Sequence, residues 1–212
     1  VPWWVTLVAA TKGQRSAPSG QASAAGVTIC GENRVQGMTA HLDDDAYAGA
    51  ALHFIGHLQT NKVRQVVGRV ELIESVGSEH LLEASEAQAA KLELVQDILL
   101  EVNIGGEASK SGISPEELSA LAAQAVGSPH VRLRGLMAIP PVAAGPDGNR
   151  PFFAKMRQLY VDIRSQMDDN KTSFDCLSMG MSGDFEDAVR EGATLVRVGT
   201  ALFGPRPPMK KG

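Results

Sequence analysis

The sequence predicts an α/β protein that forms one (β/α)8 barrel, a TIM barrel, over residues 1–212. Short apolar runs alternate with helical patterns along the whole chain, and no linker or change in composition marks a second domain. The runs are almost continuously apolar, which is typical of parallel strands covered on both faces. Eight such units in 212 residues fit a closed barrel better than an open doubly wound sheet. Because the active sites of this fold lie at the carboxyl ends of the strands, we expect the functional residues there.

The strands are expected where the apolar runs lie. The first run reads TLVAAT, and the last reads TLVRVG, in which one charged residue, Arg197, interrupts the apolar pattern. A buried arginine is costly without a partner, so Arg197 needs a polar group or a ligand to face. The predicted strands cover residues 6–11, 27–30, 52–56, 70–76, 97–104, 133–139, 176–181 and 194–199.

The segments between the runs carry helix signals. Ser78 is a predicted N-cap that is followed by strong helix formers. Pro115 stands at a first helical position, and Glu117 completes a capping box with Ser114. Gly192 is the predicted residue after the end of the last of these helices. The predicted helices cover residues 78–93, 114–126, 150–167 and 183–192. The third of them carries an apolar stripe at three- and four-residue spacing.

Composition excludes several classes of protein. The chain is 43% hydrophobic and 21% charged, which suits a packed core and not a disordered chain. A net charge of -4 speaks against an electrostatic nucleic-acid surface. No apolar run reaches the ~20 residues of a membrane span, and no secretory signal precedes the first strand. We therefore expect a soluble cytoplasmic protein with Cys30 and Cys176 as reduced thiols, and a monomer, because no unpaired apolar helix face stands out. Since the chain opens at Val1 directly before a strand, we expect residues upstream that were removed or omitted.

Small and polar residues gather at the predicted strand ends. Each of them alone is also explained by a turn, a helix cap or a solvated charge. The residues at these ends are Thr11, Lys12, Gly31, Glu32, Asn33, Gly56, His57, Ser75, Asn103, Ala138, Ile139, Pro140, Met181, Ser182, Gly183, Gly199 and Thr200.

The last two strand ends together predict a phosphate site. The loops after strands seven and eight of a barrel commonly bind phosphate through backbone N–H groups and a helix N-terminus. Here these loops read MSGD (181–184) and VGTA (198–201). Their glycines allow close approach of the backbone, and the hydroxyls of Ser182 and Thr200 add donors.

Lys12 closes the first strand, opposite the predicted phosphate site. The residues alone leave two interpretations open. Either Lys12 forms a Schiff base with a phosphorylated carbonyl compound, or it is one more contact to the anion. A lysine at a dry barrel mouth near other cations holds a nucleophilic amine, because its ammonium form is disfavoured there.

Two other motifs do not support a site. The stretch GGEASKSG (105–112) resembles a Walker A loop, but that motif needs Gly immediately before Lys, and Ser109 stands there. His53 and His57 have no Cys or His partner at metal spacing. We expect His53 to be a hydrogen-bonded core residue and His57 to lie at the rim, with no metal bound.

At these same positions the sequence resembles the pyridoxal-phosphate-binding homeostasis proteins, a family also described as alanine-racemase N-terminal-domain-like or proline synthetase co-transcribed proteins. The matching stretches reach from the first strand to the last. They are LVAATK, GENRVQ, HFIGHLQTNKVR, EVNIGGEASKSGI, RGLMAIP and LSMGMSGDFEDAVREGATLVRVGTALFG. The resemblance implies an alanine racemase N-terminal-domain-like barrel with pyridoxal 5′-phosphate (PLP) as its cofactor.

The resemblance also implies a role for each residue of the site. Lys12 would form the internal aldimine with PLP, and Arg197 would point toward the pyridine nitrogen. The further cofactor contacts that it implies are Asn33, Met181, Ser182, Gly199 and Thr200. Met179 is the alternative to Met181 for packing on a ring face, and Lys110 is either a second anion contact or a solvated loop residue.

Arg197 bears on whether such a protein is an enzyme. A permanently cationic donor opposite the ring nitrogen favours the unprotonated pyridine, which is a weaker electron sink than a ring paired with a carboxylate. We also expect this protein to lack the C-terminal β-domain that supplies the second base of alanine racemase. Tyr47 and Tyr160 are both predicted to fall in helical segments away from the rim.

The resemblance therefore favours a non-catalytic protein that holds PLP as a lysine aldimine for intracellular PLP homeostasis and passes it to apo-enzymes. A weak PLP-dependent amino-acid racemase is the alternative. If the resemblance is set aside, the residues alone also allow a Schiff-base aldolase that acts on a sugar phosphate.

Overall fold

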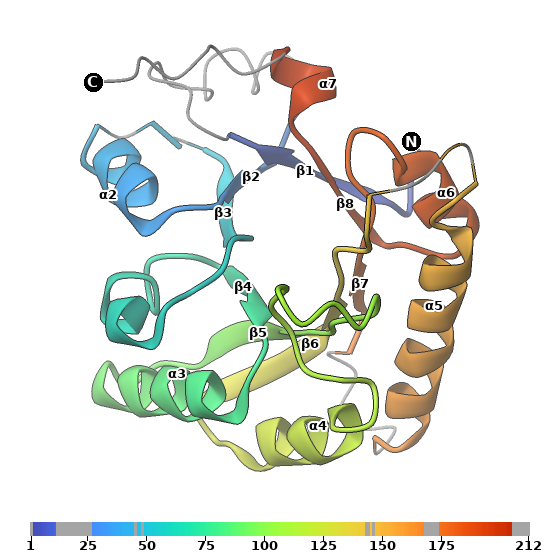
Figure 1. The fold of residues 1–212 in the computed structure, drawn as a ribbon. Coiled ribbons are helices and arrows are strands. Elements are labelled where there is room, and N and C mark those ends of the chain that lie inside the picture. Colours follow the sequence, from blue (N-terminus) through green and yellow to red (C-terminus); the bar gives the residue numbers. More distant parts are fainter. Residues whose placement is uncertain are drawn as a thin grey trace.

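Eight parallel strands form a closed barrel, as predicted, in which each strand pairs with its neighbours in chain order (Figure 1). The computed structural model describes residues 2–11, 27–44, 46–47, 49–142, 145, 147–167 and 174–204. The strands are β1 (Thr6–Ala10), β2 (Ile29–Glu32), β3 (Ala51–Phe54), β4 (Leu72–Val76), β5 (Gln96–Glu101), β6 (Val131–Met137), β7 (Cys176–Ser178) and β8 (Leu195–Val198). Pairing of β1 with β8, with Leu7 opposite Val196, closes the barrel.

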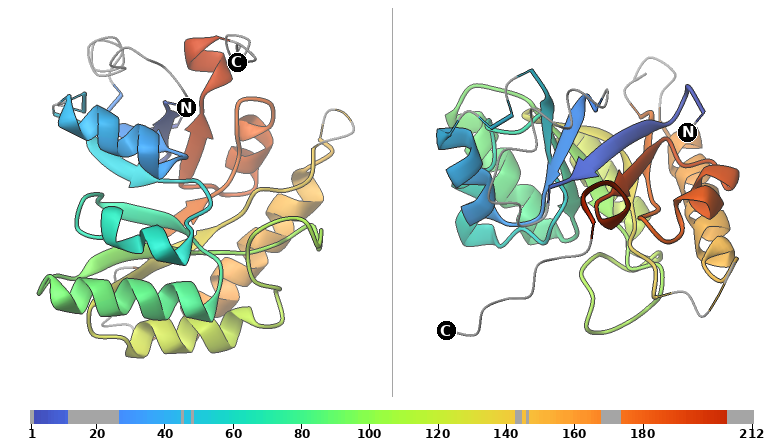
Figure 2. Two further views of the ribbon diagram at one scale, coloured as in Figure 1. Left: turned by 60° about the vertical axis from the view of Figure 1, so that its left-hand side comes forward. Right: turned by 90° about the horizontal axis from the view of Figure 1, so that it is seen from above.

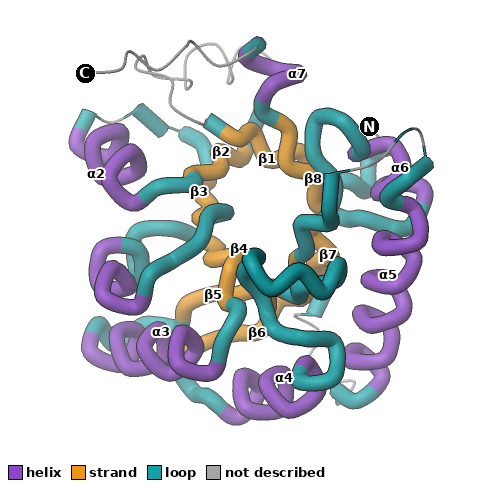
Figure 3. Tube along the Cα trace, viewed as in Figure 1, coloured by secondary structure: helices purple, strands orange, loops and turns teal. Residues whose placement is uncertain are grey.

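Helices surround the barrel wall, as the views in Figures 2 and 3 show. They are α2 (Val35–Asp43), the 3-10 helix η1 (Thr60–Gln65), α3 (Glu79–Lys91), α4 (Leu118–Gly127), α5 (Arg150–Ser165), α6 (Phe185–Arg190) and α7 (Thr200–Phe203). Four of them lie where helices were predicted, whereas α2, η1 and α7 were not predicted. None of the helices in the described ranges has the length and apolar character needed to cross a bilayer.

The helix signals of the sequence act as expected, with one shift. Ser78 caps α3, because its hydroxyl accepts a hydrogen bond from the Leu81 amide at 3.2 Å. The capping box of Ser114 and Glu117 also forms: the Glu117 amide donates to the Ser114 hydroxyl at 3.3 Å, and the Ser114 amide donates to the Glu117 carboxylate at 3.2 Å. These two residues belong to a turn, however, and regular α4 begins only at Leu118. The predicted start of this helix at residue 114 was therefore wrong by one turn.

The two largest apolar clusters of the described residues stabilise the barrel. Inside the barrel, inward-facing side chains of alternate strand residues pack on each other, among them Val8, Leu99 and Leu195. The larger core lies between the strands and the helices, and α5 contributes its predicted stripe, including Phe153 and Met156, to it.

Ion pairs link the amino-terminal parts of β5, β6 and β7. The Asp97 carboxylate accepts hydrogen bonds from Arg132 at 2.6 Å and from Arg134 at 2.7 Å, and Arg134 also binds Asp175 at 2.8 Å. These pairs lie at the end of the barrel opposite the carboxyl ends of the strands, where the site is predicted.

Strand β6 requires glycine at one point. Gly135 has a φ of 153°, and a Cβ atom there would lie 1.7 Å from the carbonyl oxygen of Cys176 on β7. The register of β5 against β6 shifts between Ile98 and Leu99, close to Gly135. A comparable shift separates Ile73 from Val76 on β4, and the buried polar residues Glu74 and Ser75 lie within it.

Candidate functional site

A cavity of about 320 Å³ lies at the carboxyl ends of the strands, where the fold predicts a site. It is lined by six of the seven predicted site residues: Asn33, Met181, Ser182, Arg197, Gly199 and Thr200. Apolar side chains, including those of Ile55, Ile139 and Phe203, complete its wall. The seventh residue, Lys12, lies outside the described residues, although Ala10 at the end of β1 also lines the cavity.

Among the described residues that line this cavity, Arg197 on β8 is the one with a charged side chain. It is buried, with an exposed fraction of 3%, and its guanidinium donates to the Ser178 hydroxyl on β7 and to the Ala138 carbonyl oxygen, the latter at 2.9 Å. A guanidinium has five N–H donors, and the described residues take two of them through these bonds. The arginine that interrupts the last apolar run therefore has donors left for a ligand in the cavity.

Glu74 on β4 is the counter-charge of Arg197 and was not predicted. Its carboxylate lies 3.8 Å from the Arg197 guanidinium and accepts hydrogen bonds from Ser178 at 2.5 Å and from His53 Nδ1 at 2.8 Å. Burial alone would raise the pKa of Glu74, but the His53 hydrogen bond and charge, with Arg197 and Ser178, lower it overall. Burial lowers the pKa of Arg197, and Glu74 opposes that shift. His53 is thus the hydrogen-bonded core residue that the sequence predicted.

Glu101 at the end of β5 is a second carboxyl group near Arg197. The described residues offer no hydrogen-bond partner to its buried Oε2 atom. Burial raises the pKa of Glu101 to about 7, and the charge of Arg197 acts in the opposite direction. The sequence held a signal for both carboxyl groups, since Glu74 and Glu101 stand within apolar runs just as Arg197 does.

The rim of the cavity is formed by the loops after β7 and β8. The Ser182 hydroxyl accepts hydrogen bonds from the backbone amides of Gly199 and Ala201, each at 3.2 Å. Gly199 packs closely on β1, because a Cβ atom there would lie 3.1 Å from the Ala10 carbonyl oxygen. Thr200 is exposed and begins α7. The loop after β7 is therefore bonded to the loop after β8 through Ser182, and the bond to the Ala201 amide was not predicted. Their role in binding phosphate stays a prediction.

Hydrogen bonds anchor the chain directly before Lys12. The Thr11 hydroxyl donates to the Glu32 carboxylate at 2.5 Å, and its amide donates to the Gly31 carbonyl oxygen at 3.0 Å. Glu32 also accepts a hydrogen bond from the Tyr47 hydroxyl at 2.6 Å. This buried carboxylate therefore ties the end of β1 to β2 and to the segment after α2.

Neither tyrosine reaches the cavity, as predicted. The prediction that Tyr47 falls in a helical segment was wrong, because Tyr47 lies in a turn. Burial, together with its bond to Glu32, raises the pKa of Tyr47. Tyr160 on α5 donates to the Phe174 carbonyl oxygen at 3.1 Å within the outer core. The two residues are all the tyrosines of the chain.

The two methionines proposed for a ring face have different surroundings. Met179 is fully buried in the core between strands and helices, whereas Met181 is 40% exposed and lines the cavity. The Met181 amide donates to Asp184 at 2.7 Å, which fixes the loop between β7 and α6. Of the two, Met181 is the residue that a ligand in this cavity can contact.

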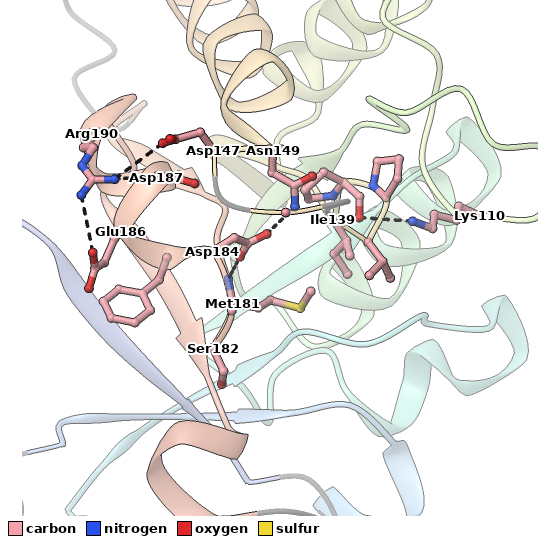
Figure 4. Close-up of a pocket in the computed structure, with 16 residues that line it drawn as sticks. Lys110, Ile139, Asp147, Asn149, Met181, Ser182, Asp184, Glu186, Asp187 and Arg190 are labelled. Atoms are coloured by element: carbon pink, nitrogen blue, oxygen red, sulfur yellow. Dashed lines mark hydrogen bonds and ion pairs between the residues drawn. The ribbon is translucent and has the colours of Figure 1, made fainter.

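A second, larger pocket of about 790 Å³ adjoins the cavity and shares Met181 and Ser182 with it (Figure 4). Lys110 and Arg190 lie at opposite sides of this pocket in that view. Lys110 pairs with Glu107 at 2.6 Å and donates to the Pro140 carbonyl oxygen at 3.2 Å. Its role as a second anion contact stays a prediction. Within the described ranges, no three His, Cys, Asp or Glu side chains are grouped to hold a metal ion.

The fold and this site define a class: a (β/α)8 barrel whose mouth combines a buried guanidinium with hydroxyl and amide groups at its rim, an arrangement suited to a small anionic ligand. Residues 9–207 match the family model described as "Alanine racemase, N-terminal domain". The chain belongs to this family and, within it, to the pyridoxal phosphate homeostasis proteins, as the following relatives show.

The proteins of that name in Aquifex aeolicus and Pseudomonas aeruginosa are 43% identical over 181 residues and 41% identical over 206 residues. The matches cover 85% and 97% of this chain, and 78% and 86% of the two relatives. The solved structure of PipY from Synechococcus elongatus with PLP bound is 34% identical, with a TM-score of 0.85, over 96% of this chain and 94% of PipY. PipY without PLP has a TM-score of 0.88 at 35% identity, with the same coverage.

Proposed function

We propose that this protein binds PLP, holds it as an aldimine on Lys12, and serves intracellular PLP homeostasis. The observation that carries the proposal is the cavity of about 320 Å³ that gathers Arg197, Asn33 and the two hydroxyl-bearing rim loops. PipY, which shares the fold at 34% identity, has been solved with PLP bound, and curated relatives carry the name pyridoxal phosphate homeostasis protein.

The residues of the cavity fit the chemical groups of PLP. Its phosphate is an anion, for which the Thr200 hydroxyl and the hydrogen of the Ser182 hydroxyl provide donors at the rim. The amides of Gly199 and Ala201 fix the Ser182 oxygen in place by donating to it. Its pyridine nitrogen is an acceptor, for which Arg197 retains N–H donors.

A carrier role is favoured over efficient amino-acid chemistry. Bound PLP supplies an electron sink for carbanions, and this sink is weak when the ring nitrogen faces a cation and stays unprotonated. Arg197 is the cation here, and both tyrosines of the chain are held elsewhere by hydrogen bonds. We therefore propose that the protein passes PLP to apo-enzymes, as a cytoplasmic monomer.

The proposal is tested by an absorption spectrum of the purified protein incubated with PLP. The wild type is expected to show a visible band of protein-bound PLP, and Lys12→Ala is expected to lose it. Lys155→Ala, which removes an exposed lysine of α5, is the matched control and is expected to keep the band. A Lys12→Ala variant with an unchanged band would contradict the site assignment.

Turnover separates the carrier from a racemase. The carrier predicts no sustained exchange of the α-proton of alanine into deuterated water, whereas a racemase exchanges it continuously. A colourless protein that cleaves a sugar phosphate would instead support an aldolase.

A further inference from the structure

A row of buried polar side chains lies behind the cavity. It consists of His53 on β3, Glu74 on β4, Ser178 on β7 and Arg197 on β8, and all four side chains are buried. Because the four residues come from four strands, the barrel itself brings them together. Only Arg197 lines the cavity, and the other three lie behind it.

The hydrogen bonds in this row run in one consistent direction. Arg197 can only donate, so its Nη1 donates to Ser178 Oγ. The single hydroxyl hydrogen of Ser178 is then given to Glu74 Oε2, 2.5 Å away. The ionised Glu74 can only accept, so His53 Nδ1 carries the hydrogen in its 2.8 Å bond to Glu74 Oε1. Both oxygens of Glu74 are thus bound, and the carboxylate cannot turn without breaking a bond.

The row determines which side of Arg197 faces the cavity. Ser178 and the Ala138 carbonyl oxygen bind two nitrogens of the guanidinium, and the Glu74 charge lies 3.8 Å from one of them. A planar group held at two nitrogens has one orientation, so its remaining N–H donors have a fixed direction. The charge of Glu101 also acts on Arg197. If the Glu74 charge were lost, Glu101 would attract the guanidinium toward β5.

We infer that Glu74 is a positioning residue that, through Ser178 and its own charge, holds the Arg197 guanidinium in the orientation that presents its remaining N–H donors to the ring nitrogen of bound PLP. This inference rests on the proposed function, because the PLP ring is the target of those donors. It predicts that Glu74 affects cofactor binding only while Arg197 is present.

The test is a double-mutant cycle on PLP affinity, measured by absorbance titration of wild type, Glu74→Gln, Arg197→Gln and the double variant. Glu74→Gln is expected to weaken PLP binding by about 10- to 100-fold, as the loss of a residue that orients a ligand-binding group usually does. In the Arg197→Gln background the same change is expected to cost less than about twofold. The pH profile of the visible band is expected to change in Glu74→Gln, because the ring nitrogen loses its aligned donors.

Asp97→Asn is the matched control, since Asp97 is also a carboxylate paired with arginines, but at the amino ends of the strands. It is expected to lower stability and to leave PLP affinity and the pH profile as in the wild type. A pH profile that moved equally in Asp97→Asn would show a general structural effect and overturn the inference.

If Glu74→Gln and Arg197→Gln do not fold, the double variant and Ser178→Ala are measured in their place. The double variant removes both charges, and Ser178→Ala keeps both and removes only the bridge. Ser178→Ala is expected to weaken PLP binding severalfold and to shift the pH profile. Wild-type affinity and profile in Ser178→Ala, or additive losses in the cycle, would overturn the inference. A wild type that binds no PLP would instead contradict the proposed function.

Discussion

In the cofactor-free protein, Glu101→Gln is predicted to be more stable than the wild type at high pH. This gain in the free energy of unfolding is expected to shrink as the pH falls. Burial raises the pKa of Glu101 from 4.5 to about 7, and the side chain has no hydrogen-bond partner for Oε2 among the described residues. A carboxyl group whose pKa is raised on folding stabilises the fold below its unfolded pKa. That stability is lost as the pH rises through the window between the two values.

The size of the effect follows from these two pKa values. A difference from 4.5 to about 7 corresponds to roughly 3 kcal/mol of folding free energy over the whole window, at 1.36 kcal/mol per unit. Most of this, roughly 2 to 3 kcal/mol, falls between pH 5 and pH 8. Because glutamine stays neutral, Glu101→Gln removes this loss, and the gain of the variant over the wild type should grow by that amount from pH 5 to pH 8.

Urea unfolding of both proteins at pH 5 and pH 8 measures how much the stability gain of the variant over the wild type changes with pH. Glu116→Gln makes the same chemical change on the exposed surface and is the control, with an expected difference near zero. If the gain of Glu101→Gln over wild type is the same at pH 5 and pH 8, the burial of an unpaired carboxyl group at this position is refuted.

Three further predictions concern the barrel. Phe153→Ala, in the fully buried stripe of α5, is expected to lower the free energy of unfolding by about 3 to 5 kcal/mol in urea, and a loss below about 1 kcal/mol would contradict the packing of this face. Gly135→Ala is expected to lower the melting temperature strongly, because a Cβ atom there meets the β7 backbone at 1.7 Å. Gly127→Ala is the control, since Gly127 has open space around it. Equal melting temperatures of the two variants would refute the close approach. Tyr47→Phe leaves the buried Glu32 without one donor and is expected to cost about 1 to 3 kcal/mol in urea unfolding, and an unchanged midpoint would show that this bond is not formed.

The fold was largely predictable, because buried parallel strands leave continuous apolar runs in the sequence. Every observed strand overlaps its predicted run, and Ser78 marked the start of α3 correctly. The elements that were missed lack such signals. Helix α2 has Arg34 at its N-cap position without a side-chain cap, and α7 has only four residues. Short or uncapped helices depend on tertiary contacts, which the local sequence does not report.

The candidate site was predictable to the extent that the barrel rule determines it. Strand ends meet at one edge, so residues far apart in the sequence, such as Asn33 and Thr200, line the same cavity. The partners behind the cavity could not be assigned in the same way. Glu74 and Ser178 are paired across the barrel through the register of the strands, and an apolar pattern reports burial but not which side chains meet. Lys12 lies outside the described residues, so its orientation remains a prediction.

Lys12 is the residue proposed to carry the cofactor. The most direct measurement is borohydride reduction of the protein incubated with PLP, followed by proteolysis and mass spectrometry of the peptides. Reduced cofactor is expected on the peptide that contains Lys12, together with loss of the visible band. Reduced cofactor on another lysine alone, or a visible band that borohydride leaves unchanged, would contradict it.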